Sequence, residues 1–507
     1  MLPTAFSDRP KDDPVPTRRT VLASPLLAAT LPAFAQSRKS ALTVALSLEP
    51  TTLDPTAKAG AEISEVVLYN IFETLTKVNG DGSVTPLLAQ SWEVSPDLRT
   101  VTFRLRPGVT FHNGQPFDAK AVQFSFDRAK VDRSTNKDRR FFANLTTRVV
   151  DDLTVVVINK EIDPDLLFQL GEASAVIVEP ASVATNGTKP VGTGPYRLDG
   201  WSRGSAITLT RWGGYRSPLP QAIPRVTFRF ISEPAAQVAA LLAGDVDLFP
   251  HAAVSRSLDQ FQRDRRFQIL FNASPGKAIL AINHRNKPLD DVRVRRAIAA
   301  AIDRRAIISA AADGRGVPIG SHYVPGAFGY IDTTGINPYD PEKAMRLLAE
   351  AGVKAPLELS LVLPPPSYAR QGGEVIAAQL AKVGIIAKIQ NVEWAQWIGN
   401  VYGKHNFDLS LILHVEPFDL VNYTRPDYYW GYQSPKFNEL FARVRNSARP
   451  ADRARWLGEA QRLLAEDAAN VYLFQPQFIT VARRELRGLW KDAPIFANDL
   501  AALSWAG

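Results

Sequence analysis

The chain has 507 residues, of which 45% are hydrophobic and 22% are charged. This length exceeds what one hydrophobic core usually supports, so we expect two or three domains. The absence of cysteine excludes disulfides, thiolate metal sites, a cysteine nucleophile and a lipid-modified cysteine anchor. The net charge of +8 comes from scattered lysines and arginines, which argues against a nucleic-acid partner.

The first 35 residues have the features of an export signal. The pair Arg18-Arg19 precedes an apolar run over residues 21–31, and a small-residue cleavage motif ends at Ala35. This run is too short to span a bilayer, and Pro25 interrupts it. We therefore predict a twin-arginine-type signal peptide over residues 1–35, followed by a soluble protein that acts in the periplasm.

The elements that follow alternate between strands and helices. Residues 42–48 alternate in polarity like a half-buried strand, which ends at Glu49, and residues 61–74 are helical in pattern. A second alternating strand covers residues 101–106. Asp118 stands where the N-cap of the next helix is expected. Further along the chain, strands and helices continue to alternate, which is typical of an α/β protein.

Several short motifs lie along this succession of elements. P-x-L-A-x-S-W begins at Pro86, T-F-x-L-R at Thr102 and G-V-x-F-H-x-G at Gly108, and residues 190–196 and 288–298 carry two further motifs. Together they resemble one family, the extracytoplasmic solute-binding proteins of peptide-type ABC importers, which serve peptides, nickel and opines.

The resemblance implies a fold and a domain organisation. We expect a two-lobed α/β periplasmic-binding-protein fold of type II, in the large three-domain variant, with hinge strands between the lobes. The expected parts are lobe I over residues 36–78, 190–272 and 478–507, an extra small domain over residues 79–189, and lobe II over residues 273–477. Two crossings between lobes would form the hinge of a closing clamp.

Aromatic and charged residues are concentrated between residues 394 and 430. Aromatic rings that flank charges after a buried strand suit a site that stacks on a ligand and pairs its charges. A hydrophobic core is the alternative for some of these rings, Trp394 and Trp397 above all. The candidate ligand-binding residues in this stretch are Trp394, Trp397, His414, Glu416, Asp419, Tyr423 and Tyr429.

The resemblance assigns more specific roles. Peptide-binding relatives place an aspartate after this strand to pair the ligand's α-ammonium, and here Glu416 or Asp419 takes that place. Arg370 aligns with an arginine of dipeptide binders and would grip a carboxylate bidentately, although a surface salt bridge is the alternative. Glu49 is expected to border the ligand. His414 lacks the spacing of a metal motif, so we predict neither metal nor cofactor, with a nickel chelate as the alternative ligand.

We predict a non-enzymatic receptor. It captures a peptide or peptide-like solute between two lobes and delivers it, as a monomer, to an ABC permease that a cytoplasmic ATPase drives. Residues 200–204 match the G-x-S-x-G motif of a secreted serine hydrolase, but a strand follows at residues 206–210 where that motif requires a helix. A sensor or chaperone role on the same fold is the other alternative.

Overall fold

The computed structural model describes residues 40–58, 60–217, 219, 222–447 and 449–506. The predicted signal peptide, residues 1–35, lies outside them. Among the helices of the described part, none is long and apolar enough to cross a bilayer.

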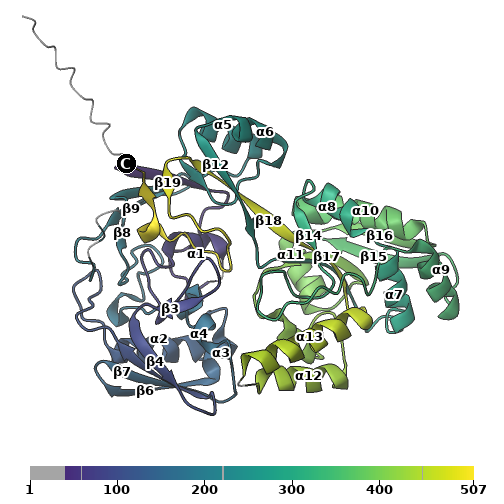
Figure 1. The fold of residues 1–507 in the computed structure, drawn as a ribbon, viewed down its shortest axis with the longest axis horizontal. Helices are drawn as coiled ribbons and strands as arrows, with labels where there is room; N and C mark the ends of the chain where they lie inside the picture. The colour runs from purple at the N-terminus through teal and green to yellow at the C-terminus, as the bar shows by residue number, and fades with distance from the viewer. Residues whose placement is uncertain (1–39, 59, 218, 220–221, 448, 507) are drawn as a thin grey trace, which may run out of the picture. The chain divides into compact units, whose positions relative to one another are not determined.

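A 12-stranded mixed sheet is the main feature of the fold, with the order β16-β15-β17-β13-β18-β11-β1-β10-β9-β8, while β12 and β14 pair with β18. We call the part around β1 and β8 to β11 lobe I, and the part around β13 to β17 lobe II (Figure 1). The strands are β1 (Ala41–Leu46), β8 (Tyr196–Ser202), β9 (Ala206–Arg211), β10 (Arg225–Phe230), β11 (Leu248–Phe249), β12 (Phe267–Ala273), β13 (Lys277–Ile282), β14 (Gly316–Pro318), β15 (Leu357–Leu363), β16 (Ile385–Asn391), β17 (Leu409–His414) and β18 (Val471–Arg483).

Strand β18 belongs to both lobes, as the long yellow arrow in Figure 1 shows. Its first residues, from Val471 to Phe474, pair with β13 of lobe II. Its last seven pair with β12, and its end also pairs with β11 of lobe I. Only residues 274–276 separate β12 from β13, and a proline and a glycine there interrupt the ladder. Two antiparallel chain segments therefore connect the lobes.

Lobe I packs its helices on the sheet through two clusters of buried apolar side chains. The helix that the sequence predicts over residues 61–74 is shorter than expected, because Tyr69 adopts a positive φ of 62°. The Tyr69 hydroxyl donates to the carbonyl of Gly171, which holds this turn in place. The remaining elements of this lobe are α1 (Ala61–Val67), α5 (Pro234–Ala243), η3 (Ser255–Ser257), α6 (Leu258–Arg263), β19 (Leu486–Arg487), η6 (Leu500–Ala502) and β20 (Ser504–Trp505).

A separate four-stranded sheet, in the order β4-β5-β7-β6, has its own apolar core and forms the small domain. The predicted strand over residues 101–106 is β5, and Asp118 caps α2 by accepting a hydrogen bond of 2.9 Å from the backbone N–H of Ala121. The elements here are β2 (Thr76–Val78), β3 (Val84–Pro86), β4 (Ala89–Val94), β5 (Thr100–Leu105), α2 (Ala119–Lys130), α3 (Arg139–Ala143), β6 (Leu145–Asp151), β7 (Thr154–Asn159), α4 (Leu166–Gln169), η1 (Ala173–Ala175) and η2 (Pro180–Ser182).

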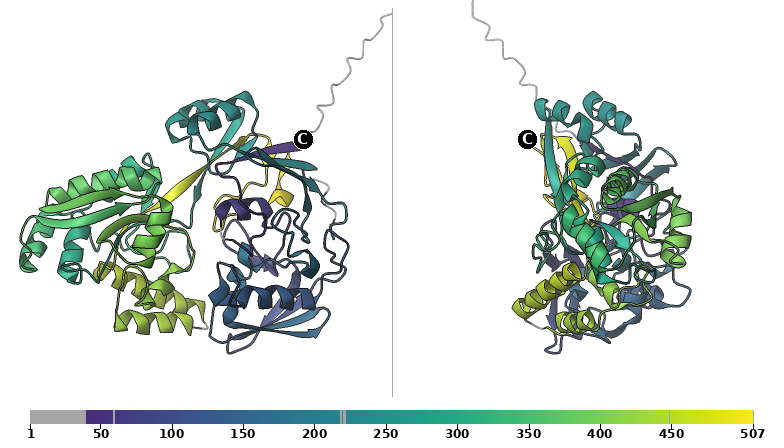
Figure 2. Two further views of the ribbon diagram at one scale, coloured as in Figure 1. Left: turned by 180° about the vertical axis from the view of Figure 1, so that it is seen from behind. Right: turned by 90° about the vertical axis from the view of Figure 1, so that its right-hand side faces the viewer.

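Lobe II has two apolar cores, one rich in aliphatic and one rich in aromatic side chains. The helices α12 and α13, which belong to the aromatic core, also approach the small domain (Figures 1 and 2), where Arg453 pairs with Asp165 at 2.5 Å. The helices of this lobe are α7 (Val292–Ala300), α8 (Arg304–Ala311), α9 (Pro341–Glu350), α10 (Ser367–Ala381), α11 (Trp394–Gln396), η4 (Trp397–Gly403), η5 (Asp419–Thr424), α12 (Pro435–Arg445) and α13 (Pro450–Glu466). The residue boundaries expected for lobes and small domain stay a prediction.

Candidate functional site

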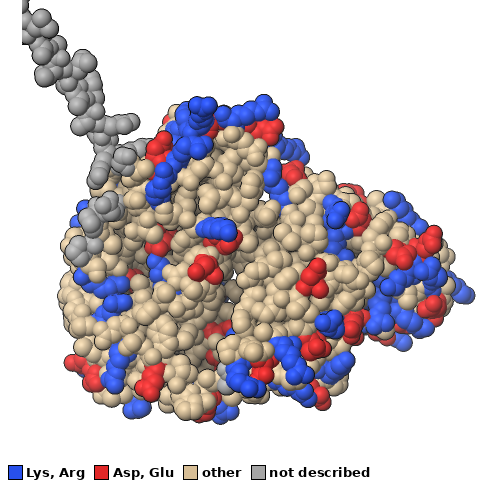
Figure 3. Space-filling model, viewed as in Figure 1, with Lys and Arg blue, Asp and Glu red and all other residues tan. Residues whose placement is uncertain are grey.

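A cavity of about 500 Å³ lies where the small domain, lobe I and lobe II meet. Its volume is in the range of small-molecule sites, which are mostly apolar with a few polar anchors. One wall comes from α1 and the loop before it, a second from the segments around residues 137–141 and 169–174, and a third from the loop after β17. Its apolar lining includes Leu68, Phe141, Val415, Phe418, Ile495 and Phe496. On the face shown in Figure 3, most lysine and arginine side chains lie toward the periphery.

A buried ion pair lies at the lobe II wall of this cavity. The Nζ atom of Lys277 is 3.1 Å from Oδ2 of Asp419, and the two side chains are 3% and 2% exposed. Lys277 also donates a hydrogen bond of 2.5 Å to the backbone carbonyl of Glu416. The ammonium group beside Asp419 is therefore supplied by the protein itself, in the place where the resemblance to peptide binders puts the ligand's ammonium.

Two histidines complete this polar cluster. Nε2 of His322 lies 3.0 Å from Oδ2 of Asp419, and Nδ1 of His414 lies 3.5 Å from the same oxygen. Burial raises the pKa of Asp419, but Lys277 and the histidines outweigh burial and hold that pKa below its usual range. Burial lowers the pKa of His322 to about 3 and lowers that of His414. At neutral pH Asp419 is therefore an anion and both imidazoles are neutral.

Each imidazole ring is hydrogen-bonded to a tyrosine hydroxyl. The hydroxyl of Tyr423 lies 2.9 Å from Nδ1 of His322, and the hydroxyl of Tyr429 lies 2.9 Å from Nε2 of His414. Both tyrosines are 1% exposed, and burial raises their pKa well above the usual value. Asn470 donates a further hydrogen bond of 2.8 Å to Tyr423. These rings orient the cluster and do not line the cavity.

Among the described side chains, one group could hold a metal ion, because its possible ligand atoms lie within 4.8 Å of one another: His322, His414 and Asp419. The cluster does not suit a metal, because the ammonium of Lys277 already provides the cation beside Asp419. Both ring nitrogens of His322 are hydrogen-bonded within the protein. A metal would have to displace the lysine and break these bonds.

The opposite wall of the cavity carries a second charged group. Lys137 Nζ lies 2.6 Å from Asp138 Oδ2 and 3.2 Å from Glu172 Oε2. Burial raises the pKa of Glu172, Lys137 lowers it, and Asp138 and Glu416 raise it further. Glu172 and Glu416 both line the cavity, Glu172 from the small domain and Glu416 from lobe II.

The structure brings together only some of the predicted ligand-binding residues. Glu416 and Asp419 line the cavity, whereas His414, Tyr423 and Tyr429 form the layer behind Asp419. Trp397 is buried and donates to Ser410 Oγ at 3.0 Å. All of these assignments stay predictions; of the residues named, Glu416 and Asp419 are the two that line the cavity.

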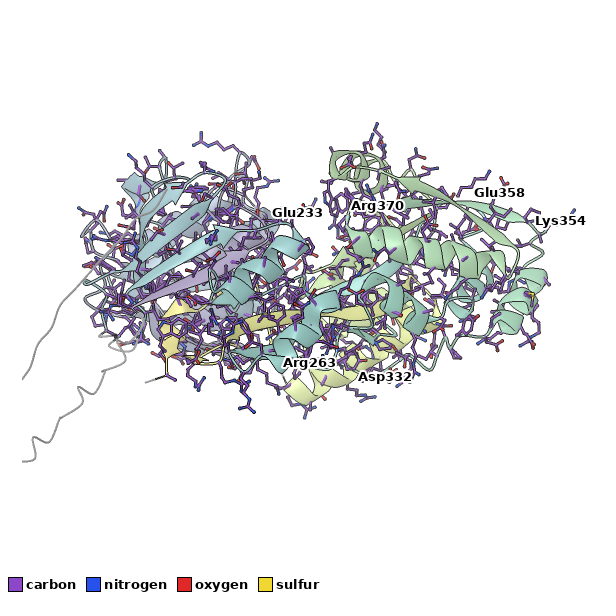
Figure 4. The ribbon with its side chains drawn as sticks, turned by 90° about the horizontal axis from the view of Figure 1, so that it is seen from above. Glu233, Arg263, Asp332, Lys354, Glu358 and Arg370 are labelled. Carbon is purple, nitrogen blue, oxygen red and sulfur yellow. The ribbon has the colours of Figure 1, made fainter. Side chains whose placement is uncertain are left out.

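Arg370, Glu49 and Trp394 are not among the residues that line the cavity. Arg370 is in the first turns of α10, at the inner end of lobe II in Figure 4, and its Nη2 atom lies 3.4 Å from a carboxylate oxygen of Glu393. Glu49 accepts hydrogen bonds of 2.9 Å from Trp201 Nε1 and from the backbone N–H of Gly204. Trp394 is 43% exposed. Their proposed contacts with a ligand also stay predictions.

The sequence reading missed Lys277, His322 and Glu172. Lys277 had a usable signal, because it opens the otherwise apolar strand KAILAI, and a lysine at a fully buried position requires a partner. His322 and Glu172 had none, since only the tertiary fold brings Glu172 to the cavity and His322 to the buried side of Asp419.

The G-x-S-x-G segment does not have the context of a hydrolase nucleophile. Ser202 is the last residue of β8 and pairs with Ala206 of β9, so the segment is a β-hairpin. A nucleophile elbow needs a strand followed by a helix.

Comparison with known proteins gives a consistent result. The model of "Bacterial extracellular solute-binding proteins, family 5 Middle" matches residues 83–418. The glutathione-binding protein GsiB of Escherichia coli (strain K12) is 25% identical over 470 residues, which cover 88% of this chain and 91% of that protein. The dipeptide-binding protein of the same strain is 27% identical over 514 residues, covering 89% and 94%.

Solved structures share the fold. The binding protein AgaA of A.tumefacien R10, in complex with agropinic acid, superposes with a TM-score of 0.80 at 26% identity, covering 92% of this chain and 99% of that one. DppA of Helicobacter pylori, in complex with the peptide STSA, gives a TM-score of 0.79 at 22% identity, covering 92% and 98%. The predicted two-lobed α/β fold is confirmed.

Proposed function

Because the chain belongs to family 5 of the bacterial extracellular solute-binding proteins, we propose that it captures a small peptide-like solute in the periplasm for an ABC importer. The observation that carries this proposal is the cavity of about 500 Å³ at the junction of lobes that two strand segments connect. Closure about such a hinge encloses a solute and removes it from water. The chemistry asked of the protein is binding and release, without a covalent step.

The volume of the cavity limits the size of the solute. At about 30 Å³ per water molecule in the liquid, 500 Å³ holds roughly 17 waters. This space suits a di- or tripeptide, or a conjugate of that size, and is too small for a long peptide. Relatives named for dipeptides and glutathione support the same size class.

Export and delivery complete the proposal. Residues 1–35 would direct the chain out of the cytoplasm as a twin-arginine-type signal peptide, and the remainder would act as a monomer without a lipid anchor. The loaded protein would dock on a permease whose ATPase subunits supply the energy, so the binding protein itself needs no cofactor and no catalytic residue.

A binding assay on the chain without residues 1–35 tests the proposal. We would measure thermal stabilisation and calorimetric affinity with dipeptides, tripeptides, glutathione and agropinic acid. We expect at least one compound to bind with micromolar or tighter affinity and to be recovered unchanged. Phe418→Ala, which removes an aromatic ring from the cavity wall, should weaken that binding, whereas Tyr339→Ala, on the exposed surface, should not. A solute recovered in cleaved form would contradict the proposal.

A further inference from the structure

Most of the carboxylates that line the cavity are paired with lysines of the protein itself. Four of the described lining residues are acidic: Asp138, Glu172, Glu416 and Asp419. On the lobe II wall, Nζ of Lys277 lies 3.1 Å from Oδ2 of Asp419. On the opposite wall, Nζ of Lys137 lies 2.6 Å from Asp138 and 3.2 Å from Glu172. Three of the four carboxylates therefore have an ammonium group of this chain within ion-pair distance.

The fourth carboxylate, that of Glu416, is largely in water. Its side chain is 65% exposed, whereas that of Asp419 is 2% exposed. Ion pairs of exposed groups contribute little, because water and salt screen them. Among the described lining residues, every carboxylate that is mostly buried is thus already paired, and a cationic group of the solute would find no free buried counter-charge there.

Lys277 is held firmly beside Asp419. It is the first residue of β13, its side chain is 3% exposed, and it donates a hydrogen bond of 2.5 Å to the backbone carbonyl of Glu416. A solute ammonium that replaced it at Asp419 would leave the lysine buried without its partner, which is strongly unfavourable. A solute ammonium beside the intact pair would lose its hydration without gaining a counter-charge. The lining residues next to Asp419 on this wall are mostly apolar: Val415, Pro417, Phe418 and Val421.

We propose that Lys277 is a specificity-determining residue: it supplies the cation for Asp419 from within the protein, so that the cavity selects solutes without a free amino group, such as N-acylated or des-amino peptides. This inference rests on the proposed function and makes it more specific. The selectivity comes from a penalty on the competitor, whose ammonium is desolvated and left unpaired. Without Lys277, the carboxylate of Asp419 would lack its cation, and the penalty would become an attraction.

Matched peptides that differ at the amino group test this preference, whatever the natural solute is. The probe is an equimolar set of Ala-Phe, Ala-Leu and Ala-Gln, their N-acetyl forms, and their des-amino forms, in which hydrogen replaces the ammonium. The chain without residues 1–35 is equilibrated with this set, freed of unbound peptide, and examined by native mass spectrometry. We expect the N-acetyl and des-amino forms to be retained about tenfold over the matched free forms, which corresponds to about 1.4 kcal/mol.

Variants at Lys277 test its role directly. The readout is the ratio of free to des-amino peptide retained by one variant, because a general loss of affinity or stability cancels in this ratio. The ratio should rise at least tenfold in Lys277→Met. It should also rise in Lys277→Gln, which keeps an N–H donor for the carbonyl of Glu416 and serves as the second variant if Lys277→Met does not fold. In Lys277→Met/Asp419→Asn, which lacks both charges, the ratio should stay within twofold of the wild type.

A matched substitution on the surface supplies the control. Lys388→Met removes a lysine from the exposed pair with Glu358 and should leave the ratio unchanged. Equal retention of free and des-amino forms by the wild type, or a preference for the free forms, would overturn the inference while the proposed function stands. An unchanged ratio in the folded Lys277 variants would overturn it as well. If the wild-type protein retained no member of the set, the inference and the proposed function would both be overturned.

Discussion

The buried pair of Lys277 and Asp419 permits a quantitative prediction. Replacing Lys277 by Met keeps the length and most of the volume of the side chain but removes its charge. The Asp419 carboxylate, 2% exposed, then keeps His322 at 3.0 Å and loses its cation. The backbone carbonyl of Glu416 also loses its hydrogen-bond donor.

The expected cost follows from the burial of both charges. Removing one partner of a buried ion pair leaves an uncompensated charge in a poorly solvated site, which costs about 3–5 kcal/mol. We therefore expect the free energy of unfolding of Lys277→Met to fall by about this amount at pH 7. Because the folded-state pKa of Asp419 is held below its usual value, the pair stabilises the wild type above the unfolded pKa of aspartate and loses this effect as pH falls.

Urea unfolding followed by tryptophan fluorescence measures this change. Trp430 is buried within 5.7 Å of His322, so its emission should report on this lobe. The double variant Lys277→Met/Asp419→Asn removes both charges and should recover at least about 2 kcal/mol relative to the sum of the single changes. A surface pair supplies the control: Lys388 and Glu358 lie 2.5 Å apart but are 58% and 54% exposed, and Figure 4 shows Glu358 on lobe II.

The control variant Lys388→Met should lose at most about 1 kcal/mol. If Lys277→Met lost no more than this control, the assignment of a buried, mutually dependent pair would be refuted. Additive effects in the double variant would contradict it as well, because independent groups show no coupling.

Three further predictions concern packing, pH and the contact between lobe II and the small domain. Gly194→Ala would place a Cβ 2.3 Å from a backbone oxygen and should lower the free energy of unfolding by more than about 2 kcal/mol. Gly200→Ala, at a position with open space around it, should change the free energy of unfolding little. Equal effects of the two substitutions in urea titrations would contradict this prediction. Burial lowers the pKa of His284 to about 3, so the unfolded chain takes up a proton at a higher pH than the folded protein does. The free energy of unfolding should therefore fall as pH drops below about 6.5, by about 2 kcal/mol at pH 5. His284→Gln should remove this part of the pH dependence, and an unchanged pH profile would contradict the prediction. Arg453→Met breaks the pair with Asp165 and should raise the solute dissociation rate severalfold in stopped-flow measurements, while an unchanged rate would show that this contact does not hold the closed state.

Local patterns in the sequence predicted the local structure well. The alternation of Val101, Phe103 and Leu105 gave strand β5 because side chains of a strand point to alternate faces. Asp118 capped α2 as expected. The helix expected over residues 61–74 ended at Val67 because the Tyr69 hydroxyl bonds to a distant carbonyl, a tertiary contact that no local pattern contains.

The candidate site was harder to predict for the same reason. Glu416 and Asp419 lie next to a predicted strand end, and the loop that follows such a strand is a common place for ligand contacts. Glu172 and His322 are separated from that loop by about 240 and 90 residues, respectively, and neither lies in a pattern that points to the cavity. Their positions follow from how the small domain and lobe II pack, and this information is distributed over the whole chain.

The central claim is that a solute binds between the lobes and leaves unchanged. A crystal structure of the protein with the tightest-binding compound of the calorimetric assay tests it most directly. We predict an intact solute in the cavity, in contact with Leu68 on one side and Phe418 on the other. A solute bound outside this cavity, or present in cleaved form, would contradict the account.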